Sequence, residues 1–194
     1  MEATHEPPVV ESLRVAEVTR RTAIPTRTIE RAVRLGLVRA ARRSPRRTWI
    51  ASDEAGYLAR RWKVLAALRD ALRTEPRVEV AAIYGSFARG EDSPGSDIDV
   101  AAWVPETWGL GELGRLEWKL SAAAGRPVDV VPWMNVVGSS IFARALLRDG
   151  RPLVDRRGHW EGLVRRKQSI RRRAAAEELK RESITRAVVA SVAG

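Results

Sequence analysis

The sequence predicts a mixed α/β (α+β) fold around a small sheet. Three apolar runs have the character of strands, namely residues 78–84, 98–104 and 128–131. Between the last two, leucines recur every three to four positions, which predicts an amphipathic helix over residues 110–124. Strands and helices that alternate in this way pack as helices on a common sheet. We therefore expect the main domain over residues 76–155.

The composition indicates a folded protein whose chemistry depends on oxygen ligands. Hydrophobic residues make up 44% and charged residues 30% of the 194 residues, which is ordinary for a globular chain. With no cysteine and two histidines, neither a disulfide framework nor a zinc site is expected. A catalytic metal would take oxygen ligands, which favours Mg²⁺. The sequence lacks the patterns of a membrane span and of a signal peptide, so we expect a cytoplasmic protein with no membrane partner.

The positive charge is concentrated at the two ends of the sequence. The formal net charge is +11, yet residues 76–155 hold more acidic than basic side chains. Basic segments on both sides of an acidic middle favour polyanions, either nucleic acid or an acidic partner surface. Nearly all of this charge is arginine, which the composition of a G+C-rich genome also favours, so charge alone leaves both interpretations open.

Residues 12–52 have the pattern of a helix-turn-helix followed by a wing. The segment Ala-Ile-Pro at residues 23–25 breaks the first helix. We expect Thr26 to cap the second helix and Gly36 to end it. These two helices and their turn would form a small domain of their own.

The wing is expected directly after the second helix. Residues 37–39 predict a short strand, residues 40–47 a basic tip and residues 48–50 the returning strand. This arrangement resembles the winged helix-turn-helix of MerR-type regulators, whose second helix enters the major groove of DNA. The resemblance implies DNA as a partner, and the alternative is a helical module that docks on protein. The candidate DNA-binding residues are Arg27, Arg31, Arg34, Arg42 and Arg43.

Helices are also expected on either side of the predicted sheet region. Residues 53–75 predict a connector helix, which begins after Ser52 with two acidic residues in its first turn. Ser139 is expected to cap a later helix that ends at residues 149–150. Residues 152–154 predict a short strand that closes the sheet.

The C-terminal segment, residues 156–194, is predicted to be a basic helical tail. The helix is expected from Gly158 to about Glu182, with His159 packed at its start rather than acting in catalysis. Its arginine and lysine side chains predict a solvated helix face, and RNA or an acidic partner is the alternative.

The first motif with chemical meaning begins where the first apolar run ends. Gly85 lets a phosphate approach the backbone closely, because glycine has no side chain. Ser86 can donate its hydroxyl to the same anion, and Arg89, one turn further on, could add a cationic contact. The ten residues after Ser86 form a loop that ends on Ser96. Gly85, Ser86, Arg89 and Ser96 are thus candidate nucleotide-binding residues.

Three carboxylates complete the motif. Asp97 and Asp99 flank Ile98 in an extended run, and side chains two positions apart leave a strand on the same face. Two carboxylates brought together repel each other unless a cation lies between them. Asp129 lies in the third apolar run, where a carboxylate without a partner would be costly. Three such groups suit the two-metal catalysis of nucleotidyl transfer.

Gly85-Ser86, the ten-residue spacer, Asp97-Ile98-Asp99 and the later Asp129 together resemble the DNA polymerase beta-like nucleotidyltransferase superfamily. Within it, the chain is similar to the minimal nucleotidyltransferase (MNT) proteins over residues 76–155. The resemblance implies that Gly85 and Ser86 hold the β- and γ-phosphates of ATP. It implies that Asp97 and Asp99 bind Mg²⁺, with Asp129 as the third ligand and as the base for the acceptor hydroxyl.

The resemblance also implies a choice of acceptors. The MNT family includes antitoxins that adenylylate a tyrosine of a HEPN-type ribonuclease toxin, toxins that modify transfer RNA, and antibiotic-modifying enzymes. A ten-residue spacer is the form associated with the antitoxins, so we expect transfer of AMP to a hydroxyl of a cognate toxin and a homo- or hetero-oligomer. The alternatives are an RNA-modifying nucleotidyltransferase and a DNA-binding regulator that only senses nucleotide. Small MNT antitoxins usually lack a segment like residues 12–50, which suggests added autoregulation or docking.

Overall fold

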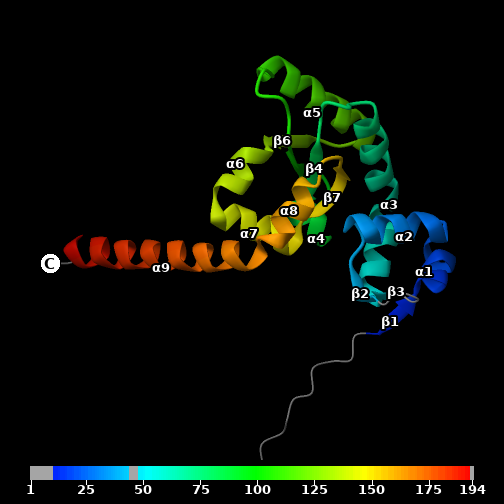
Figure 1. Cartoon of the computed structure of the whole chain (residues 1–194), viewed down its shortest axis with the longest axis horizontal. Coiled ribbons are helices and arrows are strands. Elements are labelled where there is room, and N and C mark those ends of the chain that lie inside the picture. The colour runs from blue at the N-terminus through cyan, green and yellow to red at the C-terminus, as the bar shows by residue number, and fades with distance from the viewer. Residues whose placement is uncertain (1–10, 44–47, 193–194) are drawn as a thin grey trace, which may run out of the picture. The chain divides into compact units, whose positions relative to one another are not determined.

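The computed structural model of the chain describes residues 11–43 and 48–192 (Figure 1). By its internal contacts the chain divides into two compact units, residues 1–65 and residues 66–194. The long helix α3 (Ser52–Arg73), which the sequence predicted, contributes to both units. Across the described ranges, none of the helices combines the length and the apolar character needed to cross a bilayer.

The N-terminal unit combines two short helices with a three-stranded antiparallel sheet of order β1-β3-β2. Its elements before α3 are β1 (Ser12–Arg14), α1 (Val15–Thr22), α2 (Thr26–Leu35), β2 (Ala40–Arg43) and β3 (Thr48–Ala51). The helices bury Val18 and Ile29, which are both fully inaccessible. Gly36 ends α2 in the left-handed region with φ 89°, as predicted.

Three local details of this unit differ from the prediction. Pro25 rather than Thr26 is the N-cap of α2, and no side chain caps that helix. Leu37 and Val38, which were predicted to begin a strand, instead lie buried before β2 starts. The strand β1 was not predicted. It is three residues long and exists because Leu13 pairs with Ile50 of β3, a partner that local patterns do not reveal.

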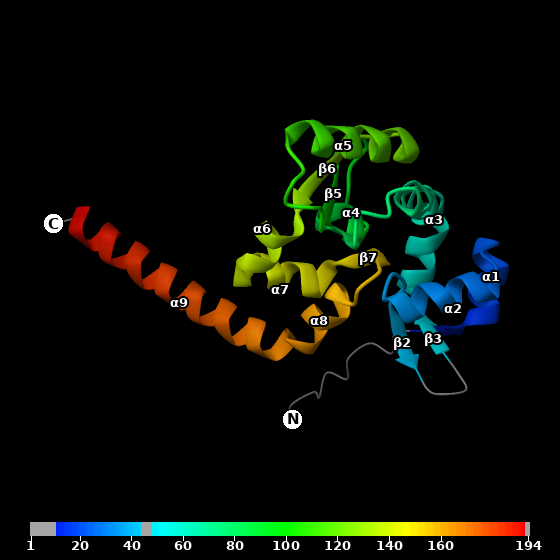
Figure 2. The ribbon, with the colours of Figure 1, turned by 45° about the horizontal axis from the view of Figure 1, so that its top comes forward.

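The sheet of the C-terminal unit has four strands in the order β6-β5-β4-β7. Figure 2 shows the strands β5 and β6 beside helix α5 (Leu110–Ala124). The strands are β4 (Val80–Tyr84), β5 (Ile98–Ala102), β6 (Val128–Pro132) and β7 (Arg151–Asp155). β4 pairs antiparallel with both of its neighbours, whereas β5 and β6 are parallel. All four strands were predicted, with ends that shift by one or two residues.

The helix α5 (Leu110–Ala124) connects the parallel strands β5 and β6 and has the bounds that the sequence predicted. It packs against β6. The hydroxyl of Ser121 accepts a hydrogen bond from the amide of Val128 at 2.9 Å, and Glu117 Oε1 accepts one from the amide of Val130 at 3.2 Å. These two bonds fasten α5 to the edge strand that carries Asp129.

Five further helices complete the C-terminal unit: α4 (Gly85–Arg89), α6 (Trp133–Gly138), α7 (Ser140–Asp149), α8 (His159–Arg165) and α9 (Lys167–Val192). Ser139 caps α7 by accepting from the amide of Phe142, as predicted. α6 was not predicted, and the tail holds two helices instead of one because the chain leaves the helical conformation at Arg166. His159 packs at the start of α8, where its ring stacks on Trp103 with centroids 5.7 Å apart.

The face of the sheet that carries the site is covered by helices. The core on this face joins β4 and β5 to α6, α7 and α8 through Val80, Ala82, Ala101, Trp133, Val136, Ala143, Leu146 and Leu163. Tyr84 and Val131 pack against the same cluster. Because side chains alternate along a strand, residues two positions from Ala101 and Val131 lie on this face as well. Those residues are Asp99 and Asp129.

Candidate active site

The strand register brings two of the three predicted carboxylates into one row. Asp99 on β5 pairs with Asp129 on β6 and, on its other side, with Tyr84 on β4. Neighbouring strands lie about 4.8 Å apart, so these three side chains start from adjacent points of the backbone. The row lies where β4 ends and where β5 and β6 begin.

Asp97 lies directly before β5 and is exposed. Its negative charge acts on Asp99, which places the two carboxylates near each other. The spacing of two residues therefore puts Asp97 beside the row, although it is not itself part of the strand.

The negative charges of the neighbouring carboxylates repel one another along the row. Burial raises the pKa of the Asp99 carboxyl above its ordinary value, and the charges of Asp129 and Asp97 raise it further. The positive charge of Arg89 acts on the same carboxyl in the opposite sense. Burial, followed by the charges of Asp99 and Asp129, raises the pKa of Tyr84 to about 12. A divalent cation at this edge would offset the repulsion.

The three predicted carboxylates do not by themselves form a complete metal-binding site in the described part of the chain. Among the described residues, no group of three or more histidine, cysteine or carboxylate side chains is arranged to hold a metal ion. This is compatible with Mg²⁺, which usually takes one or two protein carboxylates and completes its shell with water and phosphate oxygens. The donor type and the facing positions of Asp99 and Asp129 fit such an ion. The assignment of Asp97, Asp99 and Asp129 as its ligands stays a prediction.

Gly85 forms a cradle that any side chain would fill. Its φ is +71°, and a Cβ at this position would lie 2.2 Å from Oδ2 of Asp99. The chain can therefore turn from β4 into α4 directly against the Asp99 carboxylate only if this residue is glycine. Ser86 follows as the second residue of α4, and its hydroxyl makes no hydrogen bond to any described residue. Both predicted phosphate-binding residues thus border the carboxylate row.

The loop between α4 and β5 is held by Arg126, a residue that the sequence did not single out. Arg126 Nη1 binds Asp92 Oδ2 at 2.7 Å, and that carboxylate is 2% exposed. Its Nη2 donates to the hydroxyl of Ser96 at 3.0 Å and to the carbonyl of Ser93 at 3.3 Å. Its guanidinium also lies 5.5 Å from the centre of the Phe87 ring.

Ser96 is therefore engaged within its own loop. Besides the bond from Arg126, its hydroxyl donates to the carbonyl of Ser93 at 3.0 Å. A contact from Ser96 to nucleotide remains a prediction, and the structure gives the residue a second task, which is to hold the loop in place before Asp97.

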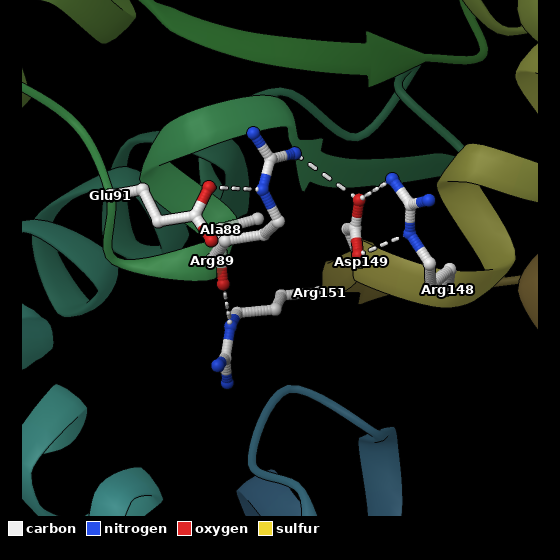
Figure 3. Close-up of polar contacts among 6 residues, drawn as sticks. All are labelled: Ala88, Arg89, Glu91, Arg148, Asp149 and Arg151. Atoms are coloured by element: carbon white, nitrogen blue, oxygen red, sulfur yellow. Dashed lines mark hydrogen bonds and ion pairs between the residues drawn. The ribbon is translucent and has the colours of Figure 1, made fainter.

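Arg89, the fourth predicted nucleotide-binding residue, ends α4 and is held by side chains on both sides (Figure 3). Its Nε donates to Glu91 at 2.6 Å and its Nη1 to Asp149 at 3.2 Å. Sequence analysis had placed residue 149 only at the end of a helix, because its partner is 60 positions away.

The arginines predicted to bind DNA lie on the N-terminal unit. Arg27, Arg31 and Arg34 are exposed on α2, opposite the buried residues Ile29 and Val33. Two further predicted residues, Arg42 and Arg43, lie on β2 and pair with Trp49 and Thr48 of β3, and their side chains lie outside the described part.

Comparisons with known proteins find sequence similarity to nucleotidyltransferases. Residues 65–145 match the sequence profile of a family described as "Nucleotidyltransferase domain". A protein of Methanocaldococcus jannaschii that carries the provisional name protein adenylyltransferase MJ0435 is 37% identical over 59 residues. The match spans 30% of this chain and 63% of the length of that relative.

Solved structures show the same fold. A chain from a crystal structure of a toxin-antitoxin with AMP-PNP superposes with a TM-score of 0.51 and 23% identity, over 64% of this chain and 98% of that chain. A chain from a mutant of the toxin-antitoxin MntA-HpeT gives a TM-score of 0.51 and 21% identity, with the same coverage. The protein thus has a mixed α/β, nucleotidyltransferase-like fold.

Proposed function

We propose that the chain is a Mg²⁺-dependent nucleotidyltransferase that transfers AMP from ATP to a hydroxyl of a partner protein. The observation that carries the proposal is the contact of the Gly85 turn with Asp99, which itself faces Asp129 across two parallel strands. This arrangement sets a place for phosphates directly beside carboxylates that can hold cations. The profile match over residues 65–145 covers all of these residues and supports the same activity.

The predicted site residues divide the tasks among them in this proposal. Gly85 and Ser86 bind the β- and γ-phosphates through backbone amides and the unengaged hydroxyl of Ser86. Asp97 and Asp99 hold Mg²⁺, which when bound neutralises the negative charge that develops on the phosphates. Asp129 lies at the open edge strand and is exposed, so an acceptor hydroxyl can reach it.

The transfer itself is a single displacement. The acceptor oxygen forms a bond to the α-phosphorus of ATP, and the bond from that phosphorus to the bridging β-phosphate oxygen breaks. The proton of the hydroxyl passes to the Asp129 carboxylate, and pyrophosphate leaves. The protein contributes mainly position and charge, as is usual for phosphoryl and nucleotidyl transfer.

The acceptor we propose is a toxin of the HEPN type, with this chain as its antitoxin. The solved structures of similar fold come from toxin-antitoxin complexes, one of them with AMP-PNP. The name of the Methanocaldococcus relative refers to protein adenylylation. A hetero-oligomer with the toxin follows from this assignment.

The test uses the full chain, Mg²⁺, the protein encoded next to it, and ATP labelled on either the α- or the γ-phosphate. The α-label should appear on the neighbouring protein and the γ-label should not. Asp99→Asn should abolish labelling, whereas Glu106→Gln, a change of an exposed carboxylate outside the row, should not. Label on added RNA instead of protein would favour the RNA-modifying alternative, and the absence of α-label from every acceptor would refute the activity.

A second candidate function is DNA binding by the N-terminal unit, which we interpret as a winged helix-turn-helix. The observation that favours it is the exposed row of Arg27, Arg31 and Arg34 on α2. A gel-shift assay with DNA from upstream of the gene should show binding that weakens steeply with salt. Arg31→Ala should weaken it, while Arg21→Ala on α1 should not, because that arginine is already paired with Glu17 at 2.8 Å. If the chain is only a regulator, Asp97→Asn should leave its biological activity intact.

A further inference from the structure

Two segments 60 residues apart meet at the end of α4 (Figure 3). Asp149, the last residue of α7, accepts a hydrogen bond from Nη1 of Arg89 at 3.2 Å. Arg151, the first residue of β7, is 2% exposed and donates from Nε to the carbonyl of Ala88 at 2.7 Å. A helix of five residues cannot fix its own geometry. The junction of α7 and β7 therefore holds the end of α4 from outside.

The Asp149 carboxylate is a rigid anchor. Its side chain is 7% exposed. Arg148 donates hydrogen bonds to both carboxylate oxygens of Asp149, from Nε to Oδ1 at 2.9 Å and from Nη2 to Oδ2 at 2.7 Å. A buried carboxylate needs such partners to remain charged, and a two-point grip by a guanidinium also fixes its orientation.

Arg89 is aligned by two carboxylates and still has donors to spare. Its Nε is bound to Glu91 and its Nη1 to Asp149, whereas its Nη2 makes no hydrogen bond to any described residue. Its side chain is 33% exposed, so a ligand can reach it. The positive charge of Arg89 opposes the rise in the pKa of Asp99 that burial and the nearby carboxylates cause, so the guanidinium lies within electrostatic reach of the carboxylate row.

The charges of this cluster leave Arg89 attractive to an anion. Arg148 neutralises Asp149 from the exposed side of α7, so the carboxylate that orients Arg89 does not cancel its charge. Glu91 is 63% exposed, and water screens its pairing with Arg89. The Arg89 guanidinium is thus fixed in position by its partners and keeps a positive charge that can bind an anion.

We propose that Asp149 is a positioning residue that holds the Arg89 guanidinium so that its Nη2 donates to the terminal phosphates of the nucleotide and to the leaving pyrophosphate. The inference rests on the proposed function, because it requires a triphosphate at Gly85. An arginine that is already held in place loses little further rotamer freedom on binding, so its contact contributes more to affinity. The arginine guanidinium has five donors in a fixed planar fork, so it can hold its two anchors and still direct donors at a phosphate, whereas a lysine has three donors on a flexible stem.

The test measures the affinity of the full chain for AMP-PNP and for AMP, both with Mg²⁺, in four proteins: wild type, Asp149→Asn, Arg89→Ala and the double variant. We expect each single variant to weaken AMP-PNP binding about tenfold, the double variant to be no weaker than Arg89→Ala, and AMP binding to be unchanged. Such non-additive losses mean that Asp149 acts through Arg89. Losses that add, or an equal loss for AMP, would overturn the proposal.

Two further proteins keep the result interpretable. Glu79→Gln is the matched control, because Glu79 is also a largely buried carboxylate with two side-chain partners, Arg157 and His159, but it lies at the opposite end of β4. It should bind AMP-PNP like the wild type. If Asp149→Asn fails to fold, Arg89→Lys carries the test, since it keeps the charge without the fork and should also lose affinity for AMP-PNP but not for AMP. If the wild type binds AMP-PNP but the losses in the Asp149 and Arg89 variants are additive, this inference alone is refuted. If the wild type binds no AMP-PNP, both this inference and the proposed function are refuted.

Discussion

Asp99 on β5 faces Asp129 on β6 across a pair of parallel strands. The two carboxylates come from segments that are 30 residues apart, and the hydrogen bonds between the strands set their alignment. Their mutual repulsion raises the pKa of Asp99, after the larger effect of burial. A site of this kind is strained by its own charge until cations bind, so function and stability should oppose each other here.

Neutralising one member of the pair should separate activity from stability. Asp99→Asn should lower the rate of AMP transfer by roughly a hundredfold or more, because a metal ligand is lost. The same change removes the repulsion of two carboxylates, so the Tm without metal should not fall. Differential scanning fluorimetry with and without Mg²⁺ checks this: Mg²⁺ should raise the Tm of the wild type and leave that of Asp99→Asn unchanged. A variant that Mg²⁺ stabilises as strongly as the wild type would contradict the assignment.

The turn at Gly85 should tolerate no side chain. In Gly85→Ala the added Cβ would lie 2.2 Å from the Asp99 carboxylate, at a φ of +71°. The left-handed conformation alone costs about 1–2 kcal/mol for a residue with a Cβ, so both the Tm and the AMP-transfer rate should fall. Gly114→Ala in α5 is the control, since its Cβ would meet nothing within 4 Å. That change should raise the free energy of unfolding by about 0.5–1 kcal/mol.

Arg126 should stabilise the fold through the loop before Asp97. Arg126→Met leaves the buried carboxylate of Asp92 without its arginine, a type of change that costs about 3 kcal/mol. Urea unfolding should show this loss. The double variant Asp92→Asn/Arg126→Met, which removes both charges, should recover much of it. A double variant as unstable as the single one would show that the loop contacts of Arg126, rather than its charge pair, carry the stability.

The ion pairs of Asp149 should make the stability of the folded protein fall at acidic pH. Burial alone would raise the pKa of Asp149, but the hydrogen bonds and charges of Arg148 and Arg89 outweigh it, so the pKa is lowered in the folded protein. A carboxyl with a lowered folded-state pKa adds stability above its unfolded pKa, near 3.9, and that stability is lost as the pH falls through the folded value.

The comparison that checks this is the Tm of wild type and Asp149→Asn at pH 7 and at pH 3. The wild type should be the more stable protein at pH 7, and the difference should shrink at pH 3. A difference that stays constant between the two pH values would mean that the contribution of Asp149 does not come from its charge.

Several elements of the fold could be predicted because their signals are local. The leucine spacing of residues 110–124 gave the bounds of α5, and Ser139 marked the start of α7. The prediction missed a strand, or shifted its ends, where pairing with another strand rather than the local sequence pattern decides which residues are extended. β1 forms because it pairs with β3. Leu37 and Val38, which were predicted to lie in a strand, are instead buried in the core before β2 begins.

The sequence by itself determined which residues are the candidates for the chemistry. A glycine that precedes a serine, and carboxylates within apolar runs, are chemical identities that need no coordinates, and Gly85, Asp97, Asp99 and Asp129 all follow from them. Only the tertiary structure decided that Asp99 lies against Gly85 and opposite Asp129, and that Asp149 holds Arg89. The physical reason is that strand register and ion pairing between distant segments are fixed by packing of the whole unit, and no local pattern of residues records them.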